Sequence, residues 1–199
     1  MALTSSHIAV FDFDGTITTK DSYIEFIIHC FGKFKTYLGF LFLSPVILLY
    51  KIRIVSNDFA KEITFTYFFK GMEVFHFLDK CDSFKYKISV ILKNEALNKI
   101  AFHQSEGHQL VIVSASMEDW IRPWAMENHF VDVIGTQPEI INNKLTGKFA
   151  TKNCYGIQKV IRLKKKISQL DQKTLHAYGD SKGDKELLKI ADFPFYKCF

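Results

Sequence analysis

Two aspartates near the start of the chain, Asp12 and Asp14, are the first residues whose type and spacing could do chemistry. The five residues before Asp12 read HIAVF, an apolar run that predicts a buried strand, and Gly15 ends it. Because side chains alternate along an extended backbone, both carboxylates should point to the same side and face one ligand. At ~4 Å and an effective dielectric of about 20, two like charges repel by roughly 4 kcal/mol, so the pair favours a cation.

More carboxylates follow in the run GDSKGD at residues 179–184, which contains Asp180 and Asp184 and comes directly after the apolar stretch 174–178. That stretch also predicts a strand, and ligands of parallel sheets bind where the strands end. Bringing these carboxylates up to the first two adds further repulsion, which again calls for a cation. Hard carboxylate oxygens, with no His or Cys ligand set near them, favour magnesium over zinc.

Ser114 and Lys159 supply two further polar groups between these carboxylates. Ser114 ends the run LVIV at 110–113, another predicted strand, and residues 116–119 (SMED) resemble a capping box that opens a helix. The free amides of such a helix attract an anion. Lys159 lies in a predicted helix over 156–167. Singly, each feature has an ordinary explanation as a turn, a cap or a solvated lysine; all together, in this order, they favour a phosphoryl-transfer site.

The order of these pieces resembles the haloacid dehalogenase superfamily, in its phosphatase branch, and more narrowly subfamily IB, which contains phosphoserine phosphatase. The resemblance covers nearly the whole chain. It implies that Asp12 is the nucleophile that takes the phosphoryl group, and that Asp14 protonates the leaving oxygen and then activates water. The remaining residues that the resemblance implies are phosphate binders at Gly15, Ser114, Ala115 and Lys159, magnesium ligands at Asp12, Asp180 and the backbone carbonyl of Asp14, and Asp184 as support for the metal shell.

Strands and helices alternate after residue 92, which predicts an α/β fold with a doubly wound, Rossmann-like parallel sheet. Asn142 and Asn143 predict the turn of a hairpin within 140–149. The remaining predicted elements are helices at 94–104, after 116, at 156–167 and at 184–190, and strands ending at 114 and at 131–134, 174–178 and 193–196.

Residues 22–91 break this alternation with long apolar periodic stretches, and they predict an all-helical cap inserted after the first strand. We therefore expect two domains, an α/β core of residues 1–21 and 92–199 and a cap of residues 22–91. The resemblance implies that such a cap closes over the site and selects the substrate. Asp21 at the hinge, and Arg53 as the one arginine of the cap, are the residues there that could bind substrate.

The most unusual part of the cap is residues 36–50, TYLGFLFLSPVILLY, which contain no charge. As a helix they would span roughly 22 Å, short of the ~30 Å hydrocarbon core, and Pro45 interrupts them. They could be a cap helix buried against its neighbours, or a surface that contacts an anionic membrane interface. The layout is also similar to bacterial phosphatidylglycerophosphatases of the same branch. The basic residues that flank the segment are Lys33, Lys35, Lys51 and Arg53.

The charge is +5 for the chain and +3 for residues 22–91, from nine basic and six acidic residues. This excess suits phosphate esters or anionic lipid but is too modest for nucleic-acid binding. The four cysteines lack metal or redox spacing and should be reduced thiols, and no signal peptide precedes Asp12. These features predict a cytoplasmic protein, with association at the cytoplasmic face of a membrane under the second interpretation of the cap.

The leading function is a Mg²⁺-dependent phosphomonoester hydrolase that acts through an aspartyl phosphate on a small-molecule or lipid phosphate. A carbon–halogen hydrolase is disfavoured, because those relatives lack the second aspartate and the metal. Three alternatives stay open at this point: phosphoserine phosphatase proper, a phosphotransferase or mutase of the same superfamily, and a catalytically silent, membrane-associated binding module.

Overall fold

A parallel five-stranded sheet forms the centre of the molecule, in the computed structural model of residues 6–199. The first five residues of the predicted core segment 1–21 lie outside the described part of the chain. The strand order is β3-β2-β1-β6-β7, and every pair is parallel. The predicted parallel α/β sheet is therefore confirmed. Its strands are β1 (His7–Phe11), β2 (Gln109–Met117), β3 (Asp132–Thr136), β6 (Thr174–Gly179) and β7 (Phe193–Tyr196).

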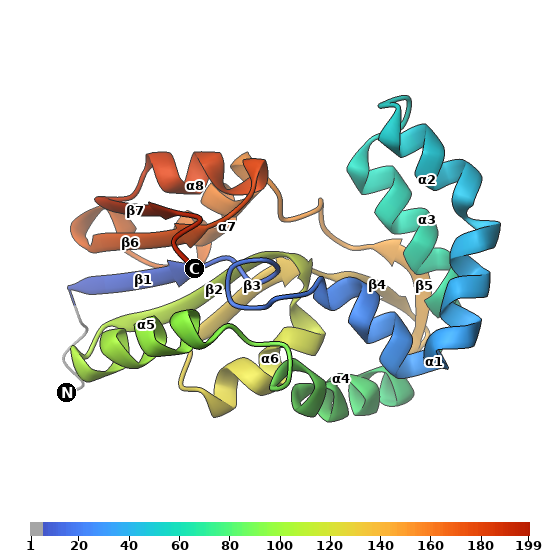
Figure 1. The fold of residues 1–199 in the computed structure, drawn as a ribbon, viewed down its shortest axis with the longest axis horizontal. Helices are drawn as coiled ribbons and strands as arrows, with labels where there is room; N and C mark the ends of the chain where they lie inside the picture. Colours follow the sequence, from blue (N-terminus) through green and yellow to red (C-terminus); the bar gives the residue numbers. More distant parts are fainter. Residues whose placement is uncertain (1–5) are drawn as a thin grey trace.

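Helices cover both faces of this sheet (Figure 1). On β1, Ala9 and Phe11 pack into the core on one face, while Ile8 and Val10 pack into a second core on the other. This division follows from the alternation of side chains along a strand, and it explains why the run is apolar throughout. The first face carries α5 (Asn94–Ser105) and α6 (Glu118–Glu127); the second carries α7 (Ile157–Lys166) and α8 (Lys185–Lys189).

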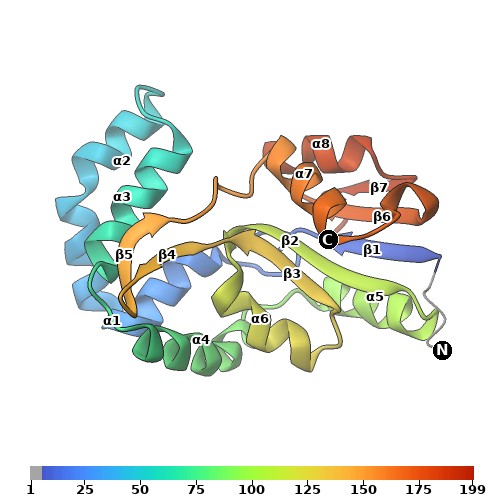
Figure 2. The same cartoon turned by 180° about the vertical axis from the view of Figure 1, so that it is seen from behind.

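Four helices between β1 and α5 stand beyond the carboxyl ends of the strands (Figures 1 and 2). An aromatic contact joins the first of them to the helices that cover the sheet: Phe26 of this helix stacks on Trp120 of α6, with ring centroids 4.5 Å apart. Such ring pairs contribute stabilising free energy beyond that gained by burying the surface of the rings. The four helices are α1 (Ser22–Phe42), α2 (Ser44–Lys51), α3 (Asn57–Phe69) and α4 (Val74–Ile88).

The predicted hairpin is confirmed as β4 (Pro138–Ile141) and β5 (Lys144–Phe149). Its turn residues Asn142 and Asn143 have φ values of 49° and 59°, the left-handed conformation that asparagine tolerates. The hairpin packs on α3: the ring of Phe149 lies 5.5 Å from that of Phe65, and its backbone N–H donates to Glu62 Oε2. A segment from the later part of the chain thus shares a core with the helices that follow β1.

The uncharged segment 36–50 is divided between two helices. The helix α1 is broken at Gly32, where φ is 78°, and α2 starts at Ser44, so that Pro45 sits in its first turn, where the missing N–H costs nothing. Within residues 6–199, no helix by itself has the length and hydropathy to cross a membrane. α1 and α2 reach those values only as a pair, with their axes bent by 62°.

Most of this segment lies on the surface. Within 36–50 only Thr36, Gly39 and Leu43 are buried, whereas Leu41 is 67% exposed. The interpretation of the segment as a helix buried against its neighbours is therefore wrong for most of its residues. The exposed large apolar residues from 34 to 54 are Phe34, Tyr37, Leu38, Leu41, Phe42, Leu48, Leu49, Tyr50, Ile52 and Ile54, which we call the apolar cap surface.

Candidate active site

The predicted site residues converge at the carboxyl ends of three neighbouring strands. Asp12 follows β1, Ser114 lies in the last part of β2, and Asp180 follows β6. Because β1 pairs with both other strands in parallel, their ends lie side by side at one edge of the sheet. Lys159 enters from α7, and the carboxylates of Asp12, Asp180 and Asp184 come within 4.8 Å of one another.

Lys159 is the centre of this cluster and is only 2% exposed. Its Nζ donates to Asp12 Oδ1 at 2.6 Å and to Asp184 Oδ1 at 2.5 Å. Burial opposes the charged form, yet the two carboxylates raise the pKa of Lys159 above its ordinary value. Burial raises the pKa of Asp12 to about 7 while Lys159 works against that rise. The ammonium therefore stays charged and holds both carboxylates in place.

Asp184 fixes the loop that carries Asp180. Its Oδ2 accepts hydrogen bonds from the backbone N–H and the hydroxyl of Ser181, at 2.9 and 2.8 Å. Although burial acts the other way, Lys159 and these bonds lower the pKa of Asp184. A side chain at Gly179 would collide with the Cβ of Asp184, so only glycine fits there. Asp184 thus stays ionised and orients the loop.

Position 15 requires glycine because Asp180 packs closely against it. A Cβ at this position would lie 2.5 Å from Asp180 Oδ2, and the φ of 81° also favours glycine. Thr16 Oγ1 donates to Asp180 Oδ1 at 3.3 Å, and the Gly15 carbonyl accepts a hydrogen bond from Lys93 Nζ. The Asp-x-Asp-Gly turn and the third carboxylate are therefore packed directly on each other.

The carboxylate of Asp14 accepts hydrogen bonds from residues outside this cluster. Oδ1 accepts from the backbone N–H of Ser22 at 2.6 Å, and Oδ2 accepts from the hydroxyl of Ser116 at 2.5 Å. Burial is the main cause that raises the pKa of Asp14. The two serines hold this carboxylate between the start of α1 and the end of β2.

The predicted capping box at Ser116 is wrong. The strand β2 continues to Met117, and α6 begins at Glu118 with no side-chain hydrogen bond at its cap. Ser116 is therefore extended at the edge of the sheet, where its hydroxyl donates to Asp14 instead of closing a helix turn. A local pattern gave no hint of this partner, which lies 102 residues away in sequence.

Ser114 and Ala115 line the same edge. Ser114 is buried, and its Oγ accepts from the backbone N–H of Ser116 at 3.1 Å. The carbonyl of Ala115 accepts from Thr136 Oγ1 at 2.9 Å and from Lys61 Nζ at 3.0 Å. Both residues lie in the part of β2 where its pairing with β3 shifts register.

Lys61 of α3 is a candidate that the sequence analysis missed. Its ammonium has the Ala115 carbonyl as hydrogen-bond acceptor and lies 5.3 Å from the centre of the Tyr23 ring; within residues 6–199 no carboxylate forms an ion pair with it. Burial lowers the pKa of Lys61, against the pull of Asp14, Asp21 and Asp12. One sequence signal could have pointed to Lys61. Residues 60, 64 and 65 are small or apolar and lie at helical spacing around it, which predicts that this part of the helix faces the core.

The two proposed substrate contacts of the cap differ in their surroundings. Asp21 caps α1, where Oδ1 accepts from the backbone N–H groups of Tyr23 and Ile24 at 2.9 and 3.2 Å. It also lies near enough to raise the pKa of Asp14. Arg53 sits exposed after α2 with a φ of 62°, and in the described part of the chain no hydrogen bond or ion pair joins it to the site.

The donor set of the carboxylate cluster fits magnesium. Asp12, Asp180 and Asp184 offer oxygen alone, and neither His nor Cys belongs to this group. With one ammonium among three carboxylates, the cluster remains negative when all four groups are ionised, so a second cation is favourable. Hard oxygen ligands of this kind suit Mg²⁺.

Comparison with known proteins gives a consistent result. The haloacid dehalogenase-like hydrolase family model matches residues 9–189. Protein CicA of Caulobacter vibrioides is 30% identical over 194 residues, which cover 96% of this chain and 86% of CicA. A protein of unknown function from Bordetella pertussis Tohama I shares the fold with a TM-score of 0.76 at 18% identity, over 94% of this chain and 87% of its own. A phosphoserine phosphohydrolase-like protein from Francisella tularensis gives 0.65 at 15%, over 96% and 85%.

Proposed function

Since the chain belongs to the haloacid dehalogenase-like hydrolase family, we propose that it is a magnesium-dependent phosphatase that hydrolyses phosphomonoesters through a phosphorylated Asp12. The observation that carries this proposal is the buried ammonium of Lys159 between Asp12 and Asp184, beside Asp180. An anionic phosphoryl group beside a nucleophilic carboxylate needs such positive charge, since positioning and electrostatics dominate phosphoryl transfer.

The reaction has two steps. In the first, a carboxylate oxygen of Asp12 attacks phosphorus, the ester P–O bond breaks, and Asp14 gives its proton to the leaving oxygen. In the second, Asp14 takes a proton from water, whose oxygen attacks phosphorus; the bond between phosphorus and the Asp12 oxygen breaks, which releases inorganic phosphate and regenerates the Asp12 carboxylate. The bonds that Ser116 and Ser22 make to Asp14 support this role, because they hold its carboxyl in place, and this carboxyl is near enough to Asp12 for its charge to raise the pKa of Asp12.

The remaining residues of the site are proposed to bind and orient the phosphoryl group and the magnesium ion. Lys159, Ser114 and the backbone of Gly15 and Ala115 are proposed to hold the phosphoryl oxygens. The magnesium ion would be held by Asp12, Asp180 and the Asp14 carbonyl, with Asp184 supporting them. When bound, it supplies positive charge that offsets the charge of the transferring group. Lys61, directed at the Ala115 carbonyl, adds a partly buried cation on the side of the helices α1–α4.

The metal requirement gives the direct test of this function. Turnover of an aryl phosphate is expected to need Mg²⁺ and to stop when a chelator removes it. Asp180→Asn removes one negative ligand, so it should raise the Mg²⁺ concentration for half-maximal turnover by at least about tenfold. Asp82→Asn, an exposed aspartate of α4, is the matched control and should leave this concentration unchanged. Turnover that persists without any divalent metal would overturn the mechanism.

We propose that residues 22–91 act as a cap over this site and that the substrate is the phosphomonoester group of a membrane lipid. The apolar cap surface supports this, with Phe34 exposed by 81% and Leu41 by 67%. An exposed apolar patch of this extent marks an interaction site. Basic side chains at its margins suit anionic headgroups. These exposed basic residues are Lys33, Lys35, Lys51 and Arg53.

Vesicle flotation checks the lipid proposal. We expect the protein to float with vesicles rich in anionic lipid and Leu41→Asp to lose most of this binding, because it places a charge in the apolar cap surface. Phe75→Asp is the matched control: Phe75 is 73% exposed on α4, outside that surface, and should float like the wild type. Equal flotation of wild type and Leu41→Asp would contradict an interfacial role.

The substrate itself is decided by competing assays. Lipid phosphomonoesters in vesicles and a panel of soluble phosphates, phosphoserine among them, should be compared for kcat/KM. The lipid proposal expects the lipid to exceed every soluble ester. A preference for phosphoserine would instead make the chain a phosphoserine phosphatase, and transfer to an added alcohol rather than to water would make it a phosphotransferase.

A further inference from the structure

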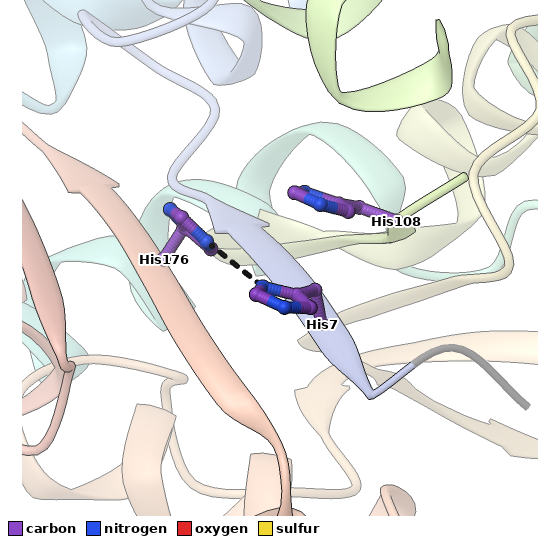
Figure 3. Close-up of side chains that lie close together, drawn as sticks. All are labelled: His7, His108 and His176. Atoms are coloured by element: carbon purple, nitrogen blue, oxygen red, sulfur yellow. Dashed lines mark hydrogen bonds between the residues drawn. The ribbon is translucent and has the colours of Figure 1, made fainter. Parts of the chain in front are cut away.

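Three histidines meet at the opposite end of the sheet from the carboxylates, at the amino ends of the strands (Figure 3). His7 opens β1, His108 directly precedes β2, and His176 lies early in β6. One ring nitrogen from each lies within 4.8 Å of the others, and all three residues are partly exposed. His7 Nδ1 and His176 Nε2 are 3.5 Å apart.

The register of the sheet causes this meeting. Residue 8 pairs with residue 109, so His7 stands opposite His108 across the β1–β2 pair. His176 pairs with Ala9 on the other side of β1, and Ala9 shares a face with His7 because side chains alternate. The three rings therefore lie on one face of three neighbouring strands.

A fourth histidine supports the group from α5. His103 is 1% exposed; its Nδ1 lies 2.8 Å from His108 Nδ1, and its Nε2 lies 2.8 Å from the hydroxyl of Tyr178. A hydrogen bond to the far nitrogen of a histidine fixes which nitrogen is available and how the ring is oriented. His103 and Tyr178 would thus act as outer partners of His108.

Burial also disfavours the protonated form of three of these four histidines, which suits metal binding. Burial is the main cause that lowers the pKa of His108 and of His176, with their neighbouring histidines adding to it. Burial lowers the pKa of His103 to about 3. Burial thus favours neutral imidazole, the form that binds metals, at His103, His108 and His176.

We propose that His7, His108 and His176 form a binding site for a divalent transition metal, with zinc as the ion that fits best. Three imidazole nitrogens and one open position are a common zinc arrangement, and magnesium avoids such donors. Tetrahedral Zn–N bonds of about 2.0–2.1 Å place two nitrogens about 3.4 Å apart, close to the separation of the His7 and His176 nitrogens. The His7 and His108 rings are stacked, with centroids 4.7 Å apart, so binding needs one ring to turn about its side-chain bonds.

A metal here would tie together the amino ends of β2, β1 and β6, three neighbours in the sheet. The consequence is structural, because the phosphoryl site lies at the other ends of these strands. The proposal stands independently of the proposed function: it concerns different residues and a metal of different chemistry.

Calorimetric titration of the untagged full chain with Zn²⁺ tests this site, with Mg²⁺ at saturating concentration to keep the carboxylate cluster occupied. We expect one zinc per chain. At about 100 times the dissociation constant, the thermal midpoint should rise by about 5–10 °C. Binding of Co²⁺ should give the visible absorption of a nitrogen-ligated tetrahedral ion. Absence of stoichiometric Zn²⁺ binding, or a Co²⁺ spectrum of an all-oxygen octahedral site, would overturn the proposal.

Single substitutions locate the ion. His108→Asn and His176→Asn should each weaken zinc binding by at least about 100-fold, beyond the 10- to 100-fold expected for an outer partner. His76→Asn, an exposed histidine of α4, is the matched control and should bind like the wild type. Unchanged zinc affinity in both ligand variants, with loss in Asp180→Asn, would assign the ion to the carboxylate cluster and reject the histidine site. Should either ligand variant fail to fold, the wild-type Co²⁺ spectrum still decides.

Discussion

Asp12→Asn is expected to lower the turnover of an aryl phosphate by roughly 10⁴-fold or more, since it removes the oxygen anion that attacks phosphorus. An amide oxygen is a poor nucleophile, and the covalent route is closed with it. Steady-state kinetics in saturating Mg²⁺ measure the loss. A second readout is direct: wild-type protein trapped during turnover should carry one acid-stable, hydroxylamine-sensitive phosphoryl group, and the variant none.

The fold should tolerate this change. Lys159 keeps its bond to Asp184 at 2.5 Å, and the oxygen of the new side-chain amide can accept a hydrogen bond where the Asp12 carboxylate did. Asp171→Asn makes the same chemical change at an exposed aspartate paired with Lys164, and it should keep full activity. If Asp12→Asn retained more than about a tenth of the wild-type turnover, the nucleophile would have to lie elsewhere.

Lys159→Met is expected to lower the free energy of unfolding by about 3–5 kcal/mol in metal-free buffer at a pH above the pKa of Asp12, where both carboxylates are ionised, and to abolish turnover. Methionine fills much of the volume of lysine but leaves Asp12 and Asp184, both buried, without their shared cation. The loss of unfolding free energy is largest without metal, so added Mg²⁺ should restore part of the stability. Urea unfolding followed by the fluorescence of the buried Trp120 and Trp124 measures the change.

The control for this prediction is Lys164→Met, which removes the exposed ion pair with Asp171. Exposed pairs of this kind contribute about 0–1 kcal/mol, so this variant should unfold close to the wild type. A loss below about 1 kcal/mol for Lys159→Met would mean that the two carboxylates are not ionised together in the folded protein, contrary to the charges assigned here.

Local patterns predicted most of the sheet and its helices. The apolar run before Asp12, the asparagine pair of the hairpin and the helix over 94–104 are confirmed because each depends on neighbours in sequence: period, turn chemistry and side-chain alternation. Side-chain partners were harder to predict. Ser116 has the sequence of a helix cap, yet the strand continues past it and its hydroxyl donates to Asp14. The course of the backbone decides that contact.

The exposure of residues 36–50 was likewise not predictable from local sequence. Hydropathy alone left residues 36–50 open to burial or exposure, because an apolar helix is equally compatible with both. The chain breaks at Gly32 and bends before Ser44, and most of the large apolar side chains of this segment are exposed. Lys61 is a similar case, since its sequence context does not reveal the carbonyl of Ala115 that it reaches.

The sequence by itself determined the order of the chemical residues, their placement at strand ends and the excess of carboxylate that calls for a cation, because these depend on residue type and local periodicity. Tertiary structure alone decided how the charges pair and which side chains are brought together. Lys159 is buried between two carboxylates, Asp14 is held by two serines, and His7, His108 and His176 form a group. Strand register and helix packing set these contacts, and several of them join residues more than a hundred positions apart, such as Asp12 with Lys159 and Asp14 with Ser116.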